Sequence, residues 1–337
     1  MSSIAKLGFV VWVGGGQIAK RRKRRPLSQR APMKRLVLSL AIAALAGAAA
    51  SAQVRAADAP PPLLKAVPPV SFVPSSAFFL GVGGGYNVSD FGTQNVYAVG
   101  TSDVYRNGLL ISSGSAAGPA SIDTNSQPAV AFSAQGGYFQ HFNGSDWLWG
   151  AKFAYSYLGA TSIVRNALLP QAGSFTATGS NVAVPFTGNA LVQSFQNNIT
   201  HQLAFVPFIG KSFDRSMIYV GAGPTVSQVR TTLNGLIGFA DINGTRTDVS
   251  GSPVNFSSTS WVYGGAATVG ASYFLGPSWF IDVNYTFAMT GNNTSSFSGP
   301  FTNPNGANGS TTVGTMVGTS AGRLITQGIV ASINKTF

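Results

Sequence analysis

The feature that most constrains this chain is a strict alternation of large apolar and small or polar side chains. It is clearest where Asp282, Asn284, Thr286 and Ala288 stand between the large apolar residues of the set Trp279, Ile281, Val283, Tyr285 and Phe287. A β-strand places every second residue on one face, whereas a helix would spread these aromatic residues around its circumference. The segment 147–157 alternates in the same way, through two Trp, one Phe and two Tyr. Both segments are therefore predicted to be strands.

Six further segments show a weaker alternation. They are 77–88, 129–142, 199–213, 217–231, 261–274 and 324–337. Each is long enough for a tilted strand to cross a bilayer, which takes about 9–11 residues. Glycine pairs and triplets inside three of the six predict tight curvature or close packing of the sheet.

The connections between the eight predicted strands alternate in length. Three are tight, at 143–146, 214–216 and 276–278, and the other four hold about 30–40 residues each. Because an open sheet edge cannot be satisfied in lipid, strands that span a bilayer must close into a barrel. The predicted fold class is all-β: a closed antiparallel eight-stranded transmembrane β-barrel with long external loops and short periplasmic turns.

The charges are few and unevenly placed. Only 9% of the residues are charged, against about 25% in an ordinary soluble domain. Residues 1–56 hold eleven of the 21 Lys and Arg and no acid, which leaves ten bases and nine Asp, a net charge of +1, for the other 281 residues. The basic pI therefore comes from the N-terminal segment, and we expect no nucleic-acid partner.

The chain has no Cys and no Glu. The absence of Cys excludes disulfides, thiolate metal sites and cysteine nucleophiles. We expect no metal site and no cofactor.

The N-terminal region is predicted to be removed on export. Met33-Lys34-Arg35 precedes a 15-residue apolar run and small residues suited to cleavage, so residues 33–56 are predicted to be a signal peptide. A membrane-spanning helix is the alternative, but the run is shorter than the roughly 20 residues that a helix needs.

The flanking segments are assigned by composition. Residues 1–32 are predicted to be an over-extended start or a basic leader, with a nuclear-localisation or nucleic-acid patch and a twin-arginine signal as alternatives. Residues 57–76 are Pro-rich and are predicted to form a periplasmic tail. The barrel is then assigned to residues 77–337.

The aromatic residues of the predicted strands separate into two levels, as Trp and Tyr do at the two membrane interfaces. The predicted girdle is Trp147, Trp149 and Trp279 on the periplasmic side and Tyr155, Tyr157, Trp261, Tyr263 and Tyr285 on the outer side. This grouping follows from the positions of the aromatic residues along the predicted strands, so it supports the barrel separately from the lengths of the connections.

Two charged residues are predicted to face the inside of the barrel at a similar height, Lys152 and Asp282. Buried charges need partners. We expect them to belong to a polar network in the lumen that plugs the barrel or gates a narrow path. Two arrangements remain open: a contact between them across the lumen, or separate solvation of each by water and neighbouring hydroxyl and amide groups.

Nucleophilic catalysis has few candidate residues. The two histidines, His141 and His201, have no Ser at a short spacing, and only Asp is available to orient a base. We therefore expect that this chain is not an enzyme, and a lipid-modifying activity is kept as an alternative of low weight.

The chain resembles the small outer-membrane β-barrel proteins of the OmpA/OmpX type. It is most similar to the alphaproteobacterial porin-like surface antigens, whose mature chains often begin as 57–60 and 65–66 do here, with Ala-Asp-Ala-Pro and Lys-Ala. The resemblance implies a C-terminal assembly signal, here Phe337, Ile333, Ala331 and Ile329. Lys335 departs from that pattern, since an apolar residue is usual at its position.

The resemblance also implies a location and partners. The location is the outer membrane with both termini in the periplasm, and the partners are outer-membrane lipid, lipopolysaccharide and the barrel-assembly machinery. The expected function is a structural and surface-contacting role through the external loops. The sequence of these loops does not identify a surface ligand. The alternative is a narrow channel for ions or small solutes.

Overall fold

The computed structural model describes residues 72–242 and 244–337, which fall in the unit Val67–Phe337. The predicted leader, 1–32, and signal peptide, 33–56, lie outside the described residues, as does most of the Pro-rich tail. Within the two described ranges, no helix is long and apolar enough to cross a membrane.

The described chain is almost entirely antiparallel β-structure. Its strands are β1 (Ser76–Asp90), β2 (Thr93–Arg106), β3 (Leu109–Asp123), β4 (Gln127–His141), β5 (Trp147–Ala177), β6 (Ala183–Ser212), β7 (Ser216–Ile242), β8 (Thr245–Asp248), β9 (Val254–Gly276), β10 (Trp279–Thr290), β11 (Asn293–Gly306), β12 (Ser310–Gly322) and β13 (Ile325–Thr336), with a single 3-10 turn, η2 (Ala307–Gly309), before β12.

Eight of these strands pair with one another in a ring. The order is β1, β4, β5, β6, β7, β9, β10 and β13, and β13 pairs back to β1. The eight segments predicted from alternation match these eight strands, with at most one residue beyond a strand end, and the three tight connections lie within one residue of the predicted positions. Each strand of the ring therefore has hydrogen-bonding partners on both sides, which an edge strand lacks.

Glycine permits the close pairing of β1 with its neighbours. A Cβ atom at Gly85 would overlap the carbonyl oxygen of Ile329 on β13, and one at Gly83 would overlap the carbonyl oxygen of Ala331. The Gly-rich stretch of β1 therefore belongs in a strand, where it lets the neighbouring backbone approach.

The prediction of long loops between the strands is wrong, and so is the count of eight strands. The first long connection holds β2 and β3, and the last holds β11 and β12. The other two are occupied mainly by the far parts of β5, β6, β7 and β9, and β5 pairs with β6 from Trp147↔Lys211 as far as Thr176↔Ala183. The described residues thus form thirteen strands.

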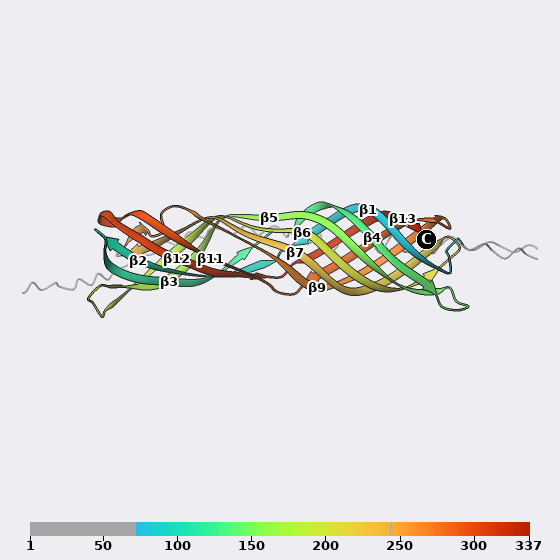
Figure 1. The fold of residues 1–337 in the computed structure, drawn as a ribbon, viewed down its shortest axis with the longest axis horizontal. Helices are drawn as coiled ribbons and strands as arrows, with labels where there is room; N and C mark the ends of the chain where they lie inside the picture. The colour runs from blue at the N-terminus through green and yellow to red at the C-terminus, as the bar shows by residue number, and fades with distance from the viewer. Residues whose placement is uncertain (1–71, 243) are drawn as a thin grey trace, which may run out of the picture. The chain divides into compact units, whose positions relative to one another are not determined.

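The strands divide into two parts, which we name the ring half and the extension. The ring half comprises β1, β4, β10, β13 and the adjoining parts of β5, β6, β7 and β9, at 147–158, 199–212, 216–229 and 261–276. The extension comprises β2, β3, β8, β11, β12 and the remainder of the four long strands. Figure 1 shows the labels of β2, β3, β11 and β12 toward one end and those of β1, β4 and β13 toward the other.

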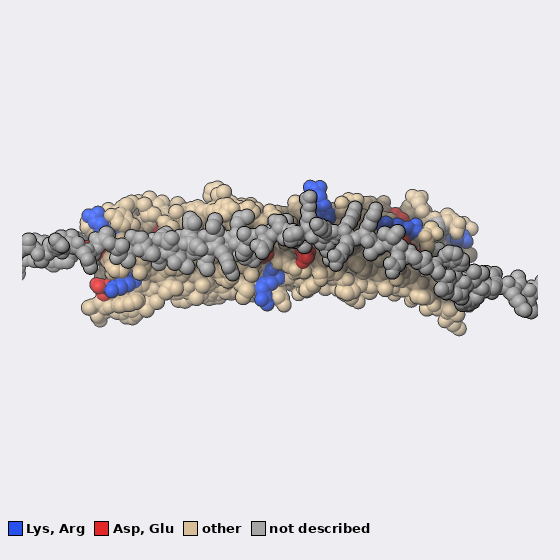
Figure 2. Space-filling view, turned by 180° about the vertical axis from the view of Figure 1, so that it is seen from behind, with Lys and Arg blue, Asp and Glu red and all other residues tan. Residues whose placement is uncertain are grey.

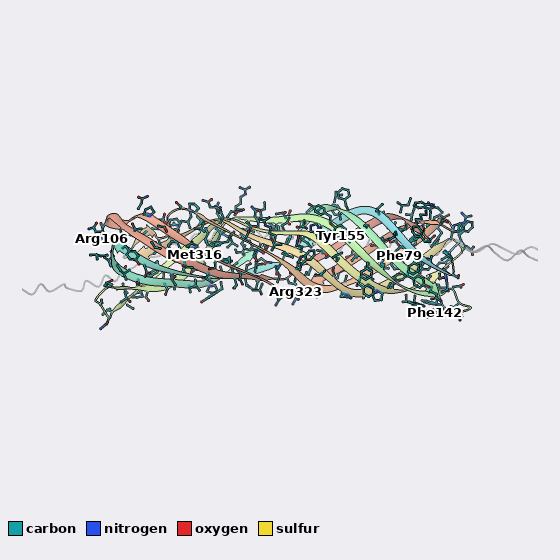
Figure 3. All side chains as sticks on the ribbon, viewed as in Figure 1. Phe79, Arg106, Phe142, Tyr155, Met316 and Arg323 are labelled. Atoms are coloured by element: carbon teal, nitrogen blue, oxygen red, sulfur yellow. The ribbon has the colours of Figure 1, made fainter. Side chains whose placement is uncertain are left out.

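Short breaks between consecutive strands, where the chain leaves the β conformation for two residues, mark the boundary between the two halves. Phe91 and Gly92 lie between β1 and β2, and Gly92 has a positive φ of 60°. Arg323 and Leu324 lie between β12 and β13. In Figure 3, Arg323 lies midway between Arg106 at one end of the structure and Phe142 at the other.

The extension has one seam without a ladder. β11 pairs only with β12, and β9 pairs in its first half only with β7. Side chains fill the seam instead: the rings of Phe256 and Phe297 lie 5.4 Å apart, and Ser260 Oγ donates a hydrogen bond of 2.9 Å to Asn293 Oδ1. The wall of the extension is therefore held less firmly here than elsewhere.

Candidate functional site

The outer surface of the ring half is apolar. On β1, Phe78, Leu80 and Val82 are 63–64% exposed, and on β10 the outward side chains Ile281 and Val283 are 40% and 46% exposed. We call this surface the apolar belt. Soluble monomers rarely expose a continuous apolar surface of this extent.

The eight predicted girdle residues all lie on this outward face. Trp147, Trp149, Tyr155, Tyr157, Trp261, Tyr263 and Trp279 are exposed and Tyr285 is half-buried. Charged side chains visible in Figure 2 lie near the two ends and in a middle band, with uncharged surface between.

Strand β11 of the extension reverses this pattern. The outward positions of β11 are Thr294, Ser296, Ser298, Pro300 and Thr302, all exposed, whereas Phe297 and Phe301 on its inward face are each only 7% exposed. Other strands of the extension carry scattered outward apolar side chains, among them Tyr97, Ile163 and Val317, which are 49%, 45% and 48% exposed. The exposed apolar side chains are therefore concentrated on the ring half, and β11 has the polar outside and apolar inside of a protein in water.

Inside the ring half, a cluster of apolar side chains closes the end that carries the short turns. We call it the aromatic cluster; its members are Val73, Ala77, Phe79, Phe139, Leu148, Phe208, Met217, Tyr219, Phe274 and Phe280. Phe274 and Phe280 stack with ring centroids 4.9 Å apart, and Phe79 meets Phe280 edge-on at 5.5 Å. Val73 belongs to the segment before β1, so the chain itself helps to fill this end.

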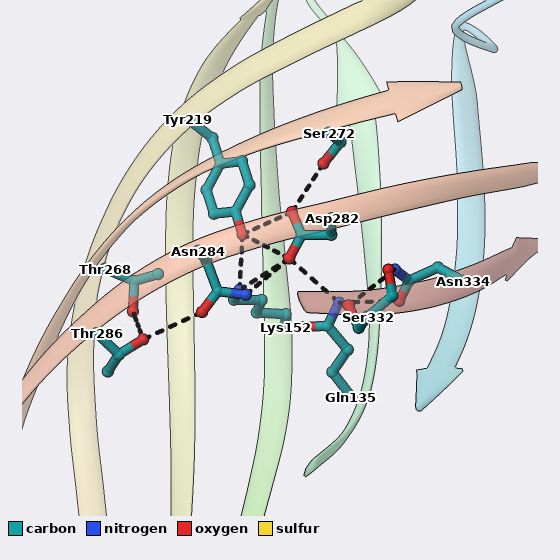
Figure 4. Close-up of polar contacts among 10 residues, drawn as sticks. All are labelled: Gln135, Lys152, Tyr219, Thr268, Ser272, Asp282, Asn284, Thr286, Ser332 and Asn334. Carbon is teal, nitrogen blue, oxygen red and sulfur yellow. Dashed lines mark hydrogen bonds and ion pairs between the residues drawn. The ribbon is translucent and has the colours of Figure 1, made fainter. Parts of the chain in front are cut away.

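Asp282 is the centre of a polar network next to the aromatic cluster (Figure 4). Its Oδ1 accepts a 2.8 Å hydrogen bond from Ser272, and its Oδ2 accepts one of 2.8 Å from Asn284. The hydroxyl of Tyr219 lies 3.0 Å from both carboxylate oxygens. A carboxylate that is only 2% exposed is stable here because several donors compensate for its lost hydration.

Lys152 reaches the same network from the opposite wall of the ring. Its Nζ donates a 2.8 Å hydrogen bond to the Tyr219 hydroxyl and lies 4.0 Å from Asp282 Oδ2. β5 and β10 are four places apart in the ring of eight, so the ammonium and the carboxylate meet across the interior. Of the two arrangements left open by the sequence, the structure has the direct contact, with a tyrosine hydroxyl shared by both charges.

Gln135 ties the network to two more strands. Its Nε2 donates hydrogen bonds to Asn334 Oδ1 at 2.8 Å and Ser332 Oγ at 3.0 Å, both on β13. The same nitrogen lies 3.4 Å from Asp282 Oδ2. Six ring strands thus contribute side chains to one network. Sequence reasoning found its two charged members and missed Tyr219 and Gln135.

A small polar cavity of about 50 Å³ adjoins the network, lined in part by Lys152, Gln202 and Thr268. Past it lies a second apolar cluster, here called the waist cluster: Phe91, Ala131, Leu158, Ala160, Ile199, Val229, Val262 and Leu324. Along the inward face of β5, Leu148 belongs to the aromatic cluster, Lys152 to the polar network and Leu158 to the waist cluster. The polar cavity therefore lies between two apolar layers.

The two histidines have different surroundings. His141 Nε2 lies 2.8 Å from Ser212 Oγ, but its Nδ1 faces the Ser75 carbonyl oxygen at 3.2 Å, where a catalytic histidine would meet a carboxylate. His201 Nδ1 lies 2.8 Å from the Tyr155 hydroxyl on the outer surface. In residues 72–242 and 244–337, no three His or Asp side chains are grouped so that they could hold a metal ion.

The residues of the predicted assembly signal all point outward. Ile329, Ile333 and Phe337 are 46%, 47% and 68% exposed, and Ala331 is also exposed. Lys335, which departs from the pattern, shares this face and places its ammonium 5.2 Å from the Phe337 ring. The apolar stripe of β13 is therefore continuous with the apolar belt.

Comparisons with known proteins give only distant likenesses. No protein-family model and no curated protein sequence matches the chain. Among solved structures it is similar to the outer membrane protein OprG from Pseudomonas aeruginosa, with 9% identity over 76% of this chain and 98% of that one and a TM-score of 0.26.

It is also similar to Neisserial surface protein A and to the attachment invasion locus protein Ail of Yersinia pestis. The identity to each is 10%, the TM-scores are 0.27 and 0.21, and the matches cover 74% and 69% of this chain and 99% of each of those chains. TM-scores this low carry no inference about what this chain does.

Proposed function

We propose that this chain is an outer-membrane β-barrel protein with a structural and surface-contacting role. In this proposal the ring half is a closed eight-stranded barrel that crosses the bilayer, and the extension stands on the outer side. The observation that carries it is the apolar belt, which covers the ring half, whereas the outward face of β11 in the extension is made of Ser, Thr and Pro.

The dimensions of the ring half suit a bilayer. β10 and β13 have 12 residues each, which at about 3.3 Å per residue is roughly 40 Å of strand. At a tilt near 45°, that length spans about 28 Å, close to the 25 Å apolar band of outer-membrane barrels. The Trp and Tyr residues of the girdle lie toward the two ends of the belt, as interfacial aromatics do.

Both ends of the described chain lie at the end with the short turns. Phe79 pairs with Thr336, next to the C-terminal Phe337. An outer-membrane barrel has its short turns on the periplasmic side and its longer connections outside. We therefore place both termini of the barrel in the periplasm.

The filled interior favours a non-conducting barrel. The aromatic cluster closes the turn end, the polar network joins opposite walls, and the waist cluster lies beyond it. A narrow channel remains the second candidate, because the polar cavity beside Lys152 is the kind of space through which ions or small solutes move. The two apolar layers that bound this cavity count against it.

Planar-bilayer recording of the refolded full chain tests the non-conducting barrel. A gel in which the unboiled protein migrates differently from the boiled protein establishes that it is folded. We expect a folded barrel that gives no discrete current steps. Reproducible steps would instead assign the channel function and make Lys152 and Asp282 its first residues to study.

Trypsin treatment of intact cells tests the orientation. Arg106, at the far end of β2, and Arg246, in β8, are exposed in the extension. Lys211 and Arg215 lie beside the short turn between β6 and β7. We expect cleavage after the first pair and none after the second until the outer membrane is opened; cleavage at Lys211 or Arg215 in intact cells would contradict the proposed orientation.

A further inference from the structure

The extension contains an apolar cavity that the proposed function does not use. It has a volume of about 90 Å³ and lies between β2, β7, β11 and β12. Its lining includes Phe297, Phe301 and Met316 together with the small residues Ala98, Gly100 and Gly238. The cavity is separate from the polar one beside Lys152, because the two have no lining residue in common.

The cavity exists because the surrounding positions carry too little side chain to fill it. A Cβ atom added at Gly100 would meet no atom within 4 Å, and one at Gly238 would meet only Ser250, with the nearest atom at 3.8 Å. Elsewhere in the extension the interior is filled, and Leu169, Val192 and Phe195 are completely buried. Native interiors seldom keep a void much larger than a water molecule.

The lining decides what can occupy this space. It includes no charged side chain and its surface is mostly apolar, with Ser102, Ser115, Gln171, Asn189 and Ser250 as its polar residues. The Ser250 hydroxyl already accepts a 2.7 Å hydrogen bond from the Gly238 amide. Water needs two to four polar partners to remain in a cavity, and apolar cavities stay dry and bind apolar molecules.

We propose that this cavity is a binding site for a small, uncharged, apolar molecule. Its volume is below the roughly 150 Å³ of a cavity that takes up benzene, so we expect hydrocarbons smaller than benzene or a gas atom such as xenon. The site is next to the seam, since Phe297 and Phe301 lie on β11. Because β11 has a ladder on one side only, it can move with fewer broken hydrogen bonds than a strand that is paired on both sides.

The methionines of the chain provide a direct test with xenon as the probe. Met316 lines the cavity, Met217 belongs to the aromatic cluster, and Met289 points outward in the apolar belt, where it is 40% exposed. The full chain, labelled with ¹³C at the methionine methyl groups and refolded in lipid nanodiscs, is titrated with xenon pressure and followed by NMR. We expect the Met316 methyl shift to saturate and Met217 to stay unchanged. Met289 should move in proportion to the xenon dissolved in the lipid.

A filled-cavity variant and a matched control complete the test. Gly100→Val places its side chain in the cavity and should abolish the Met316 response. Gly276→Val, near the short turn after β9, is the control, since its Cβ would also meet no atom within 4 Å; the response should persist. A Met316 shift that is absent, or that follows Met289 without saturating, overturns the proposal. If Gly100→Val disturbs the Met217 resonance and so the fold, the wild-type titration decides alone. The saturation of the Met316 shift and its loss in Gly100→Val do not depend on whether the ring half crosses a membrane; only the Met289 comparison rests on the proposed function.

Discussion

The ammonium of Lys152 and the carboxylate of Asp282 come from opposite walls of an eight-stranded ring and meet 4.0 Å apart, with the Tyr219 hydroxyl bonded to both. The two side chains are only 4% and 2% exposed. A pair so buried gains little net stability over apolar residues, but removing one partner leaves an uncompensated charge. The contact therefore stabilises the fold when both charges are present, and losing either charge alone lowers the free energy of unfolding.

The first prediction concerns this pair. We expect Lys152→Met or Asp282→Asn alone to lower the free energy of unfolding by about 3–5 kcal/mol, because each leaves one buried charge without its partner. The double variant should lose clearly less than the sum, since neither charge remains. Urea unfolding in lipid vesicles, followed by Trp fluorescence, measures all three values. Strictly additive losses would show that the two residues are not coupled.

The second prediction concerns the shared hydroxyl. Tyr219→Phe keeps the ring in the aromatic cluster but removes the group that bonds to Lys152 and Asp282. We expect a loss of about 1–3 kcal/mol, the cost of leaving buried polar groups unsatisfied. Tyr273→Phe, on the outward face of β9, is the matched control and should change stability by much less. Equal losses for the two would mean that the buried hydroxyl has no special role.

The third prediction concerns the aromatic cluster. Phe274 is completely buried, so Phe274→Ala should destabilise the protein by about 3–5 kcal/mol through the lost burial and the cavity left behind. The control is Phe153→Ala, at an outward position that is 65% exposed, where lipid chains can occupy the vacated space. Comparable losses in vesicle unfolding experiments would show that the cluster is not close-packed.

The fourth prediction tests which half lies in the bilayer. Val283→Arg places a charge in the middle of the apolar belt, and we expect it to cost about 2–4 kcal/mol, as Arg does at the midplane of a membrane barrel. Ser298→Arg makes the same addition on the outward face of β11 and should be nearly neutral. Unfolding from vesicles compares them. A costly Ser298→Arg beside a neutral Val283→Arg would reverse the proposed placement.

Alternation predicts the eight strands of the ring because there large apolar residues alternate with small or polar ones, as on β10. The strands of the extension were missed because they are rich in Ser, Thr, Asn and Gly, with only scattered apolar residues such as Tyr97, Val313 and Val317 on their outward faces. That composition is also typical of solvated loops. The inward residues Phe297, Phe301 and Met316 are the part of the pattern that could have identified β11 and β12.

For the candidate site, the sequence predicts which side chains face the interior, but it does not predict which of them meet across it. The alternation places Lys152 and Asp282 on the inward face, but which residues meet depends on the register of strands far apart in the sequence. Tyr219 was missed because an aromatic residue in such a strand usually faces lipid. Its place on the same face as Gly221 and Thr225 is the signal that could have found it.

In the proposed placement, the apolar belt sets the depth at which this protein would lie in a membrane. A movement toward the periplasm would bring the exposed Arg323 toward hydrocarbon. A movement the other way would bring Met289 and Phe287 toward water. Either movement would cost free energy on several strands of the ring at once, because polar side chains would enter lipid or apolar ones would leave it. The extension would consequently be held at a constant height above the lipid, so whatever it contacts would meet the same surface on every copy.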